Sequence, residues 1–393
     1  MTATRSAISW RRGDRLDVTA FLLLLGSAVA LQFSIAAGEA LLALAALAWA
    51  GLLVTRRERV AVPPVFWPLA AYAGLTLVSA LFSRDPLASL SASKELLLFL
   101  TVPIVYRLCR GERAPQAVDV IVTAGAVSAI IGIVQYGVLH YDHLGRRPQG
   151  ALTHYMTYSG VLMLVVTAAT ARLLFRREGR IWPSLVMPAL LVALALTFTR
   201  SAWVGACAGI GLLLVLKDLR LLALLPVAAA VFIGLAPERI TARVYSMFDL
   251  NDPTNRDRVA MLKSGARMVR DHPLTGVGPD MVKVVYADYR DAAAVEPVTL
   301  HLHNVPMQIA AERGLVALGA WVWFIVGVVV ALVRRLRLPS ARALAAGGLA
   351  ALTAMVTAGM FEYNFGDSEF LVLLLVLVTL PFATLGREPA RPA

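Results

Sequence analysis

The stretch GLVALGAWVWFIVGVVVALV, residues 314–333, is twenty residues long and contains no charged side chain. A helix of this length spans about 30 Å, which is about the thickness of the hydrocarbon core of a bilayer. A backbone in lipid must satisfy its own hydrogen bonds, and a helix does so. The stretch therefore predicts a membrane-spanning helix.

Similar apolar runs fill most of the chain. Hydrophobic residues make up 59% of the 393 residues and charged residues only 16%. The mean hydropathy is +0.71. We therefore predict an all-α polytopic membrane protein with about twelve transmembrane helices. The predicted spans are residues 18–36, 39–55, 63–82, 93–108, 117–139, 150–174, 181–199, 201–216, 219–235, 314–333, 341–362 and 368–385.

The basic residues predict how these spans are oriented. Seven segments on one side hold 22 of the 37 Lys and Arg residues, whereas the short loops on the opposite side hold five. Because short cytoplasmic loops are rich in Lys and Arg, we expect both termini in the cytoplasm and residues 236–304 outside. This topology accounts for the net charge of +12 without a nucleic-acid partner, since cytoplasmic basic residues meet anionic membrane lipids.

The predicted organisation has three parts. Residues 1–235 hold the first nine spans, residues 236–304 form one large exterior loop, and residues 305–393 hold the last three spans. Within the loop, apolar residues at helical spacing over 256–269 predict an amphipathic helix that ends before His272-Pro273. A glycine turn at 276–278 follows, and a second helix is expected within 280–294.

Two arginines, Arg200 and Arg258, are candidate anion ligands. Arg200 lies between two apolar runs with almost no loop, where a charged side chain is costly and often functional. Its guanidinium suits two-point binding of phosphate, and the alternative is an interfacial arginine that reaches to lipid. For Arg258 and Arg267 in the exterior loop, the alternative is a solvated or lipid-facing stripe.

Two histidines precede the span at 314–333. His303 is a candidate proton acceptor, because histidine titrates near neutral pH, and a structural role is the alternative. His301 is expected to be a bystander. The two histidines would share a metal ion only in an extended segment, and no nearby acidic cluster completes such a site. We therefore predict no metal site.

Four motifs together resemble those of the O-antigen ligase and polymerase superfamily of membrane glycosyltransferases. His303-Asn304 with Glu312 and Gly314 resembles its HN-x(7)-E-x-G signature. The segment DHPLTGVG, residues 271–278, resembles a second element and follows Arg258 at the expected distance. Thr199-Arg200-Ser-Ala is similar to a third element, and GALTH at 150–154 loosely resembles a fourth.

The resemblance implies a transferase fed by a lipid-linked sugar. It would move a polysaccharide from undecaprenyl diphosphate to a hydroxyl of lipid A-core, on the periplasmic face of the bacterial inner membrane. His303 would be the base, and Arg200 and Arg258 would bind the diphosphate. Direct displacement would invert the anomeric centre, without a cofactor or metal. The candidate supporting residues are Asn304, Glu312, His301 and Arg267.

Other functions fit parts of the same pattern. An O-antigen polymerase and a protein O-oligosaccharyltransferase belong to the same superfamily. We favour the ligase because the outer loops at 83–93 and 140–149 are short and about eight residues follow the last span. The alternative from another class is a secondary transporter, which would place ionisable groups near the bilayer midplane. Among the predicted spans only His154 is a candidate for such a group.

Overall fold

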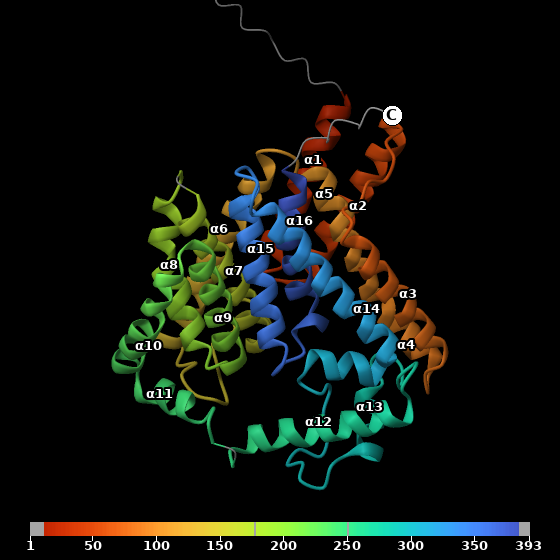
Figure 1. The fold of residues 1–393 in the computed structure, drawn as a ribbon, viewed down its shortest axis with the longest axis vertical. Helices are drawn as coiled ribbons and strands as arrows, with labels where there is room; N and C mark the ends of the chain where they lie inside the picture. The colour runs from red at the N-terminus through yellow and green to blue at the C-terminus, as the bar shows by residue number, and fades with distance from the viewer. Residues whose placement is uncertain (1–11, 177, 250, 385–393) are drawn as a thin grey trace, which may run out of the picture.

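The computed structural model describes residues 12–176, 178–249 and 251–384, and within these residues it contains helices and loops but no β-strand (Figure 1). The helices of the first part are α1 (Arg12–Ala30), α2 (Ile35–Arg56), α3 (Phe66–Leu81), α4 (Pro86–Ala92), η1 (Ser93–Leu100), α5 (Thr101–Leu108), α6 (Arg113–Gly137), α7 (Tyr155–Phe175), α8 (Ile181–Leu196), α9 (Arg200–Lys217), η2 (Leu219–Ala223) and α10 (Leu224–Leu235). The remaining helices are α11 (Glu238–Tyr245), α12 (Pro253–Asp271), α13 (Val282–Tyr289), α14 (Val305–Arg335), α15 (Arg342–Ala358), η3 (Asn364–Gly366) and α16 (Ser368–Ala383).

The helical membrane class is supported by helix length and composition. Within the described residues, six helical segments are long and apolar enough to cross a membrane: Ile35–Arg56, Pro86–Leu108, Arg113–Gly137, Tyr155–Phe175, Arg200–Lys217 and Val305–Arg335. Five further apolar helical segments are shorter: Phe66–Leu81, Ile181–Leu196, Leu219–Leu235, Arg342–Ala358 and Ser368–Ala383. Each predicted span contains a helix, but the count of twelve stays a prediction. The predicted cytoplasmic segments 1–17 and 386–393 lie partly or wholly outside the described residues.

The centre of the bundle is formed by α7, α15 and α16. In α16 every residue from Glu369 to Ala383 is buried. Helix α9 packs closely on α15, because Gly205 and Gly209 have no side chain there: a Cβ at either position would lie within 2.8 Å of a carbonyl oxygen of α15. This packing brings the first residue of α9, Arg200, to the same end of the bundle as the loop that follows α15.

Some of the basic residues predicted on the cytoplasmic side pair inside the protein. The buried guanidinium of Arg107 lies 2.5 Å from a carboxylate oxygen of Glu58 and 3.0 Å from one of Asp17. Arg172 of α7 makes two hydrogen bonds to Asp119 of α6. These side chains tie helices together, so the expected contact with anionic lipid does not apply to them.

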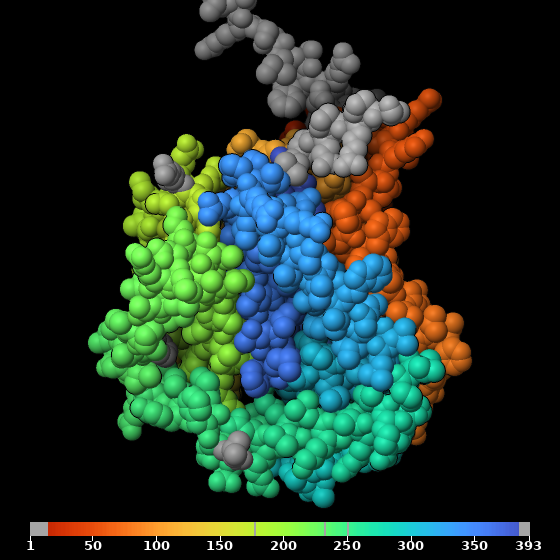
Figure 2. Space-filling view, viewed as in Figure 1, coloured from red at the N-terminus to blue at the C-terminus, as the bar shows by residue number. Residues whose placement is uncertain are grey.

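The polar segment at 236–304, which we call the exterior segment after its predicted side, lies across one end of the bundle, with α12 roughly perpendicular to the long helices (Figures 1 and 2). Asp252 caps the first turn of α12 by accepting hydrogen bonds from the backbone N–H groups of Thr254 and Asn255. The helix ends at Asp271, where His272-Pro273 predicted its end. The second predicted helix, within 280–294, is shorter than expected and covers Val282–Tyr289.

The glycine turn after α12 docks on a kink in α14. Gly314 has φ 81° and ψ 170°, so α14 bends there, and the helix begins at Val305, nine residues before the predicted span. The backbone N–H groups of Val277 and Gly278 donate to the carbonyl oxygens of Ala311 and Glu312, each at 2.9 Å. The backbone N–H of Leu315 donates to the carbonyl oxygen of Pro273 at 2.8 Å. The kink frees backbone groups for these bonds, which fix the exterior segment to α14.

Candidate functional site

Asn304 holds the segment before α14 in place. Its Oδ1 accepts a hydrogen bond from the N–H of Met307 at 2.8 Å and so caps the helix. Its Nδ2 donates to the carbonyl oxygen of Met360 at 3.0 Å, and the N–H of Val305 donates to that of Gly359 at 2.7 Å. The segment at 301–305 is therefore bound to the loop after α15. Asn304 has a positioning role here.

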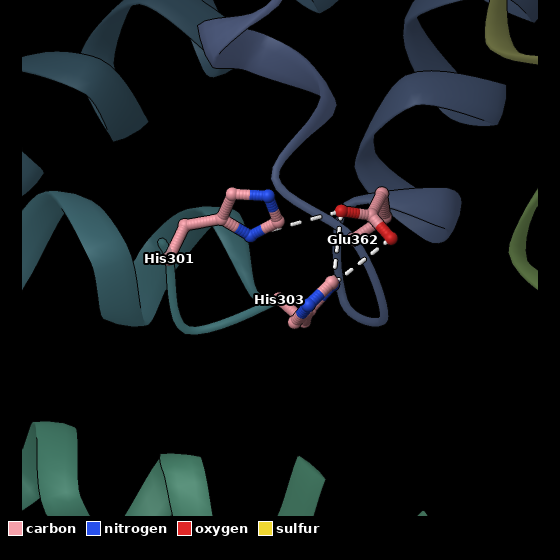
Figure 3. A group of neighbouring side chains, drawn as sticks. All are labelled: His301, His303 and Glu362. Atoms are coloured by element: carbon pink, nitrogen blue, oxygen red, sulfur yellow. Dashed lines mark hydrogen bonds and ion pairs between the residues drawn. The ribbon is translucent and has the colours of Figure 1, made fainter. Parts of the chain in front are cut away.

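His303 faces a carboxylate from that loop (Figure 3). Its Nδ1 lies 3.0 Å from both carboxylate oxygens of Glu362, a side chain from a residue only 7% exposed. An ionised carboxylate accepts hydrogen bonds only, so Nδ1 carries the hydrogen of this contact, and Nε2 is the ring nitrogen left to exchange a proton with a substrate. The backbone of His303 has φ 49°, an uncommon conformation for a residue other than glycine and one that clusters at functional sites.

The charges around Glu362 keep it ionised. Burial opposes its negative charge, but the charge and hydrogen bond of His303, with Arg258 nearby, outweigh burial and lower the pKa of Glu362 from 4.5 to about 2. The ring of His301 lies 4.3 Å from that of His303, and burial lowers the pKa of His301 to about 4. Near neutral pH, Glu362 is therefore charged and His301 is uncharged.

Arg258 reaches the same carboxylate from α12. Its guanidinium donates to the carbonyl oxygen of Phe361, and its Nη2 lies 3.9 Å from Glu362. The side chain is about a fifth exposed. Arg258 therefore places one positive charge beside the His303–Glu362 pair and connects the exterior segment to the bundle.

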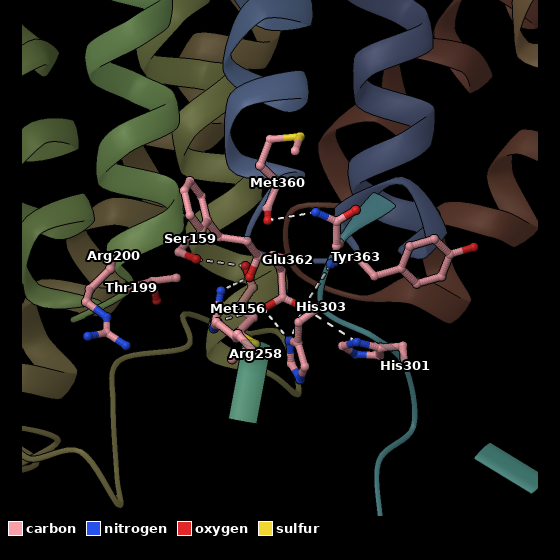
Figure 4. A network of polar contacts seen from close by, with 12 residues as sticks. Met156, Ser159, Thr199, Arg200, Arg258, His301, His303, Met360, Glu362 and Tyr363 are labelled. Carbon is pink, nitrogen blue, oxygen red and sulfur yellow. Dashed lines mark hydrogen bonds and ion pairs between the residues drawn. The ribbon is translucent and has the colours of Figure 1, made fainter. Parts of the chain in front are cut away.

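Arg200 lies on the other side of Arg258 from the histidines (Figure 4). Its Nη1 donates to the backbone and hydroxyl oxygens of Ser246 at 2.9 and 3.1 Å. Its Nη2 lies 3.5 Å from Asp252. The side chain is only 10% exposed and is held by the exterior segment, which does not fit an arginine that reaches to lipid.

Two predicted supporting residues lie away from this cluster. Glu312 is 2% exposed and forms an ion pair with Arg313 at 2.7 Å. Its backbone oxygen accepts the hydrogen bond from the N–H of Gly278. Arg267 binds Asp291 at 2.8 Å on the exterior segment. Neither has a described contact with His303. Their contacts indicate structural roles.

His301, His303 and Glu362 could together hold a metal ion. Each offers one ligand atom, and these atoms lie within 4.8 Å of one another. Two histidines and a carboxylate are ligands that several transition metals accept. The sequence shows no acidic cluster near the two histidines, but the fold brings one carboxylate, that of Glu362, to them. That the protein works without a metal stays a prediction.

The sequence did not indicate Glu362 or Arg243, and it indicated Arg147 only as one of the five basic residues in the short exterior loops. Glu362 stands 59 positions after His303, at the end of a predicted span, and only the packing of α14 and α15 joins them. Arg243 lay in the exterior segment without a motif. His154, predicted inside a span, is the N-cap of α7. Burial lowers the pKa of His154, and the nearby charge of Glu362 opposes this shift.

Residues 185–322 match the family model for O-antigen ligase. This segment of the chain is similar to the O-antigen ligase family. The matched segment runs from α8 into α14 and includes Arg200, Arg258 and His303. Glu362 and Arg147 lie outside it, on either side. A comparison with curated proteins finds no match. This similarity to the O-antigen ligase family supports an enzyme role of glycosyltransferase type in general.

Proposed function

We propose that this protein transfers a polysaccharide from undecaprenyl diphosphate to a hydroxyl of lipid A-core. The observation that carries the proposal is the shared carboxylate of Glu362, which contacts His303 at 3.0 Å and Arg258 at 3.9 Å. A base and a phosphate-binding cation thus lie side by side. This arrangement suits a reaction in which a hydroxyl loses a proton while a diphosphate leaves.

The reaction follows from these positions. The acceptor hydroxyl gives its proton to Nε2 of His303, and its oxygen forms a bond with the anomeric carbon of the donor sugar. The bond from that carbon to the diphosphate oxygen breaks, and its electron pair stays on the diphosphate. Attack opposite the leaving group inverts the anomeric centre. Arg200 and Arg258 stabilise the negative charge that develops on the diphosphate, so no metal is required.

The orientation of the active site is part of the proposal. The excess of basic residues on the side opposite to the exterior segment supports a site facing the periplasm, in a bacterial inner membrane. The donor lipid would then reach the site from the outer leaflet. The predicted partners are the lipid-linked glycan, the lipid A-core acceptor and the membrane lipids, without nucleic acid.

The test is a reconstituted transfer with one labelled donor and three acceptor conditions. Purified protein in detergent receives the undecaprenyl diphosphate glycan with lipid A-core, with a pilin-like protein, or with no added acceptor. We expect labelled glycan on lipid A-core. Longer glycan on undecaprenyl diphosphate would favour the polymerase, and glycan on a pilin-like protein the protein O-oligosaccharyltransferase. Uptake of a labelled solute into proteoliposomes, without donor consumption, would favour the transporter.

A further inference from the structure

A second group of arginines lies at the Arg200 end of the site. Arg243 of α11 lines an open cavity of about 350 Å³ together with Phe198, Ser246 and Asp252. Arg200 binds the last two of these residues, so its guanidinium lies beside the same cavity. Arg147 comes from the loop before α7, where its guanidinium lies 4.3 Å from the ring centre of Tyr155.

Arg147 and Arg243 are half-buried cations without an acidic partner. Among the residues that the structure describes, no carboxylate lies within 4.0 Å of either guanidinium, and each donates a hydrogen bond only to a backbone oxygen, of Leu144 and Phe198 respectively. Burial lowers the pKa of Arg243 to about 10, and the charges of Arg200 and Arg147 add to this effect. Two half-buried guanidinium groups without a carboxylate partner are costly to keep charged, so a bound anion would stabilise this region.

The arginines have an order along the site. Arg258 shares Glu362 with His303, and Figure 4 shows Arg200 on the other side of Arg258 from the histidines. Arg200 binds Ser246 and Asp252, which line the same cavity as Arg243. Among the described residues, the carboxylates within 4.0 Å of the four arginines Arg147, Arg200, Arg243 and Arg258 are those of Asp252 and Glu362. Asp142 also lines the cavity, but it pairs with Arg239 at 2.6 Å. The surplus of cations over carboxylates is therefore two. A diphosphate diester, whose phosphates carry one negative charge each near neutral pH, matches it.

The apolar surroundings differ between the two ends. Beyond Arg243, the side chains of Tyr245 and Phe248 are 66% and 82% exposed. Helix α10, which precedes α11, also exposes apolar side chains, among them Val231 at 54% and Leu235 at 82%. At the other end the histidines must reach the acceptor hydroxyl. A polyprenyl chain therefore finds apolar cover on the Arg243 side, continuous with α10.

We propose that the donor binds with one polarity, its lipid-bearing phosphate between Arg147, Arg200 and Arg243 and its sugar-bearing phosphate at Arg258 beside His303. This inference rests on the proposed function. The position of the anomeric carbon requires it, because that carbon must lie where an oxygen deprotonated by His303 can attack. The polyprenyl chain then leaves the site along α10 and α11.

The test uses two probes that each represent one half of the donor. Farnesyl phosphate carries only a lipid-bearing phosphate, and a hexose 1-phosphate carries only a sugar-bearing one. Binding of each to the purified full-length protein in detergent is measured by titration calorimetry. We expect Arg243→Gln and Arg147→Gln to weaken binding of farnesyl phosphate about 10- to 100-fold, which is the value of a charge-assisted hydrogen bond. Arg258→Gln should instead weaken binding of the hexose phosphate.

Arg146→Gln is the matched control, because this neighbour of Arg147 is exposed and lies over Tyr141. It should bind both probes as the wild type does, and each variant's melting temperature shows whether it is folded. The reverse pattern, equal losses for both probes, or no binding of either probe by the wild type would overturn the polarity. Transfer of glycan by a wild-type protein with the reverse pattern would leave the proposed function standing and remove only this inference.

Discussion

At the scale of single residues, Glu362 determines what His303 can do. A carboxylate at 3.0 Å from Nδ1 fixes both the ring orientation and the hydrogen on that nitrogen, and it stabilises the charged ring that forms when Nε2 accepts a proton. His303 could be proposed from the sequence because it stands in a recognisable motif. Glu362 could not, because no local pattern relates it to a histidine 59 positions earlier.

Glu362→Gln should therefore reduce the transfer rate. We expect a loss of at least ~10-fold, up to the roughly 10²–10⁴-fold that general-base assistance is worth, because a neutral amide no longer stabilises the charged ring. The measurement is kcat at saturating donor and acceptor, with donor binding as the control for folding. A rate equal to that of the wild type would remove Glu362 from the mechanism.

Glu362→Gln should also change the stability of the protein, by an amount that depends on pH. Because the pKa of Glu362 is lowered from 4.5 to about 2, its ionised form stabilises the folded protein above about pH 4.5, and this contribution is lost as pH falls toward 2. Glu362→Gln should consequently lower the melting temperature more at pH 7 than at pH 3. An equal decrease at both pH values would contradict the lowered pKa.

Arg200 offers a test of how the diphosphate is held. Arg200→Ala should reduce kcat on the order of 10²–10³-fold, the loss that accompanies removal of one preorganised charge-stabilising group. Arg200→Lys should stay impaired, since an ammonium cannot bind in the planar, two-point manner of a guanidinium. Normal transfer by Arg200→Ala at a matched protein concentration would refute the assignment.

At the scale of elements, the segment at 271–278 and the segment around Gly314, which both resemble family motifs, are joined by backbone hydrogen bonds. The turn at 273–278 and the kink at Gly314 interlock so closely that a Cβ on Gly314 would overlap the carbonyl oxygen of Leu274. The end of α12 at His272-Pro273 could be predicted because proline limits the residue before it. The kink could not, since an apolar helix predicts a straight span and only the docked turn satisfies the freed backbone groups.

Gly314→Ala should destabilise the protein. The residue combines φ 81° with no room for a side chain, so we expect a cost of at least about 1–3 kcal/mol and a lower melting temperature. Gly319→Ala is the matched control on the same helix, because nothing lies within 4 Å of a Cβ there. It should be neutral or stabilising by about 0.5–1 kcal/mol. Similar melting temperatures for the two variants would contradict the described kink.

At the scale of the whole molecule, the exterior segment covers the end of the bundle that carries the site (Figure 2). The presence of such a segment could be predicted from its polarity, and the apolar runs predicted the helices. Which helices meet depends on contacts between distant residues, such as those of Gly205 and Gly209 with α15, and a single sequence does not reveal those. The site could therefore be predicted in part only, as candidate residues without their arrangement.

Donor binding should order this exterior segment, because Arg243 and Arg258 belong to it and Arg200 to the bundle. Limited proteolysis between Asp249 and Val298 measures this directly. We expect slower cleavage when a lipid diphosphate is present than in its absence. Equal cleavage rates with and without the ligand would show that the segment does not act as a lid.

The most direct test of the central claim compares wild-type protein and His303→Ala in single-turnover transfer from undecaprenyl diphosphate glycan to lipid A-core, with and without a chelator. We predict that His303→Ala binds donor but forms no detectable product, that His301→Ala is impaired less, and that the wild type keeps its rate in the chelator. Near-normal turnover by His303→Ala would contradict the assignment of the base. Loss of wild-type activity in the chelator, restored by a divalent ion, would instead show that His301, His303 and Glu362 hold a metal.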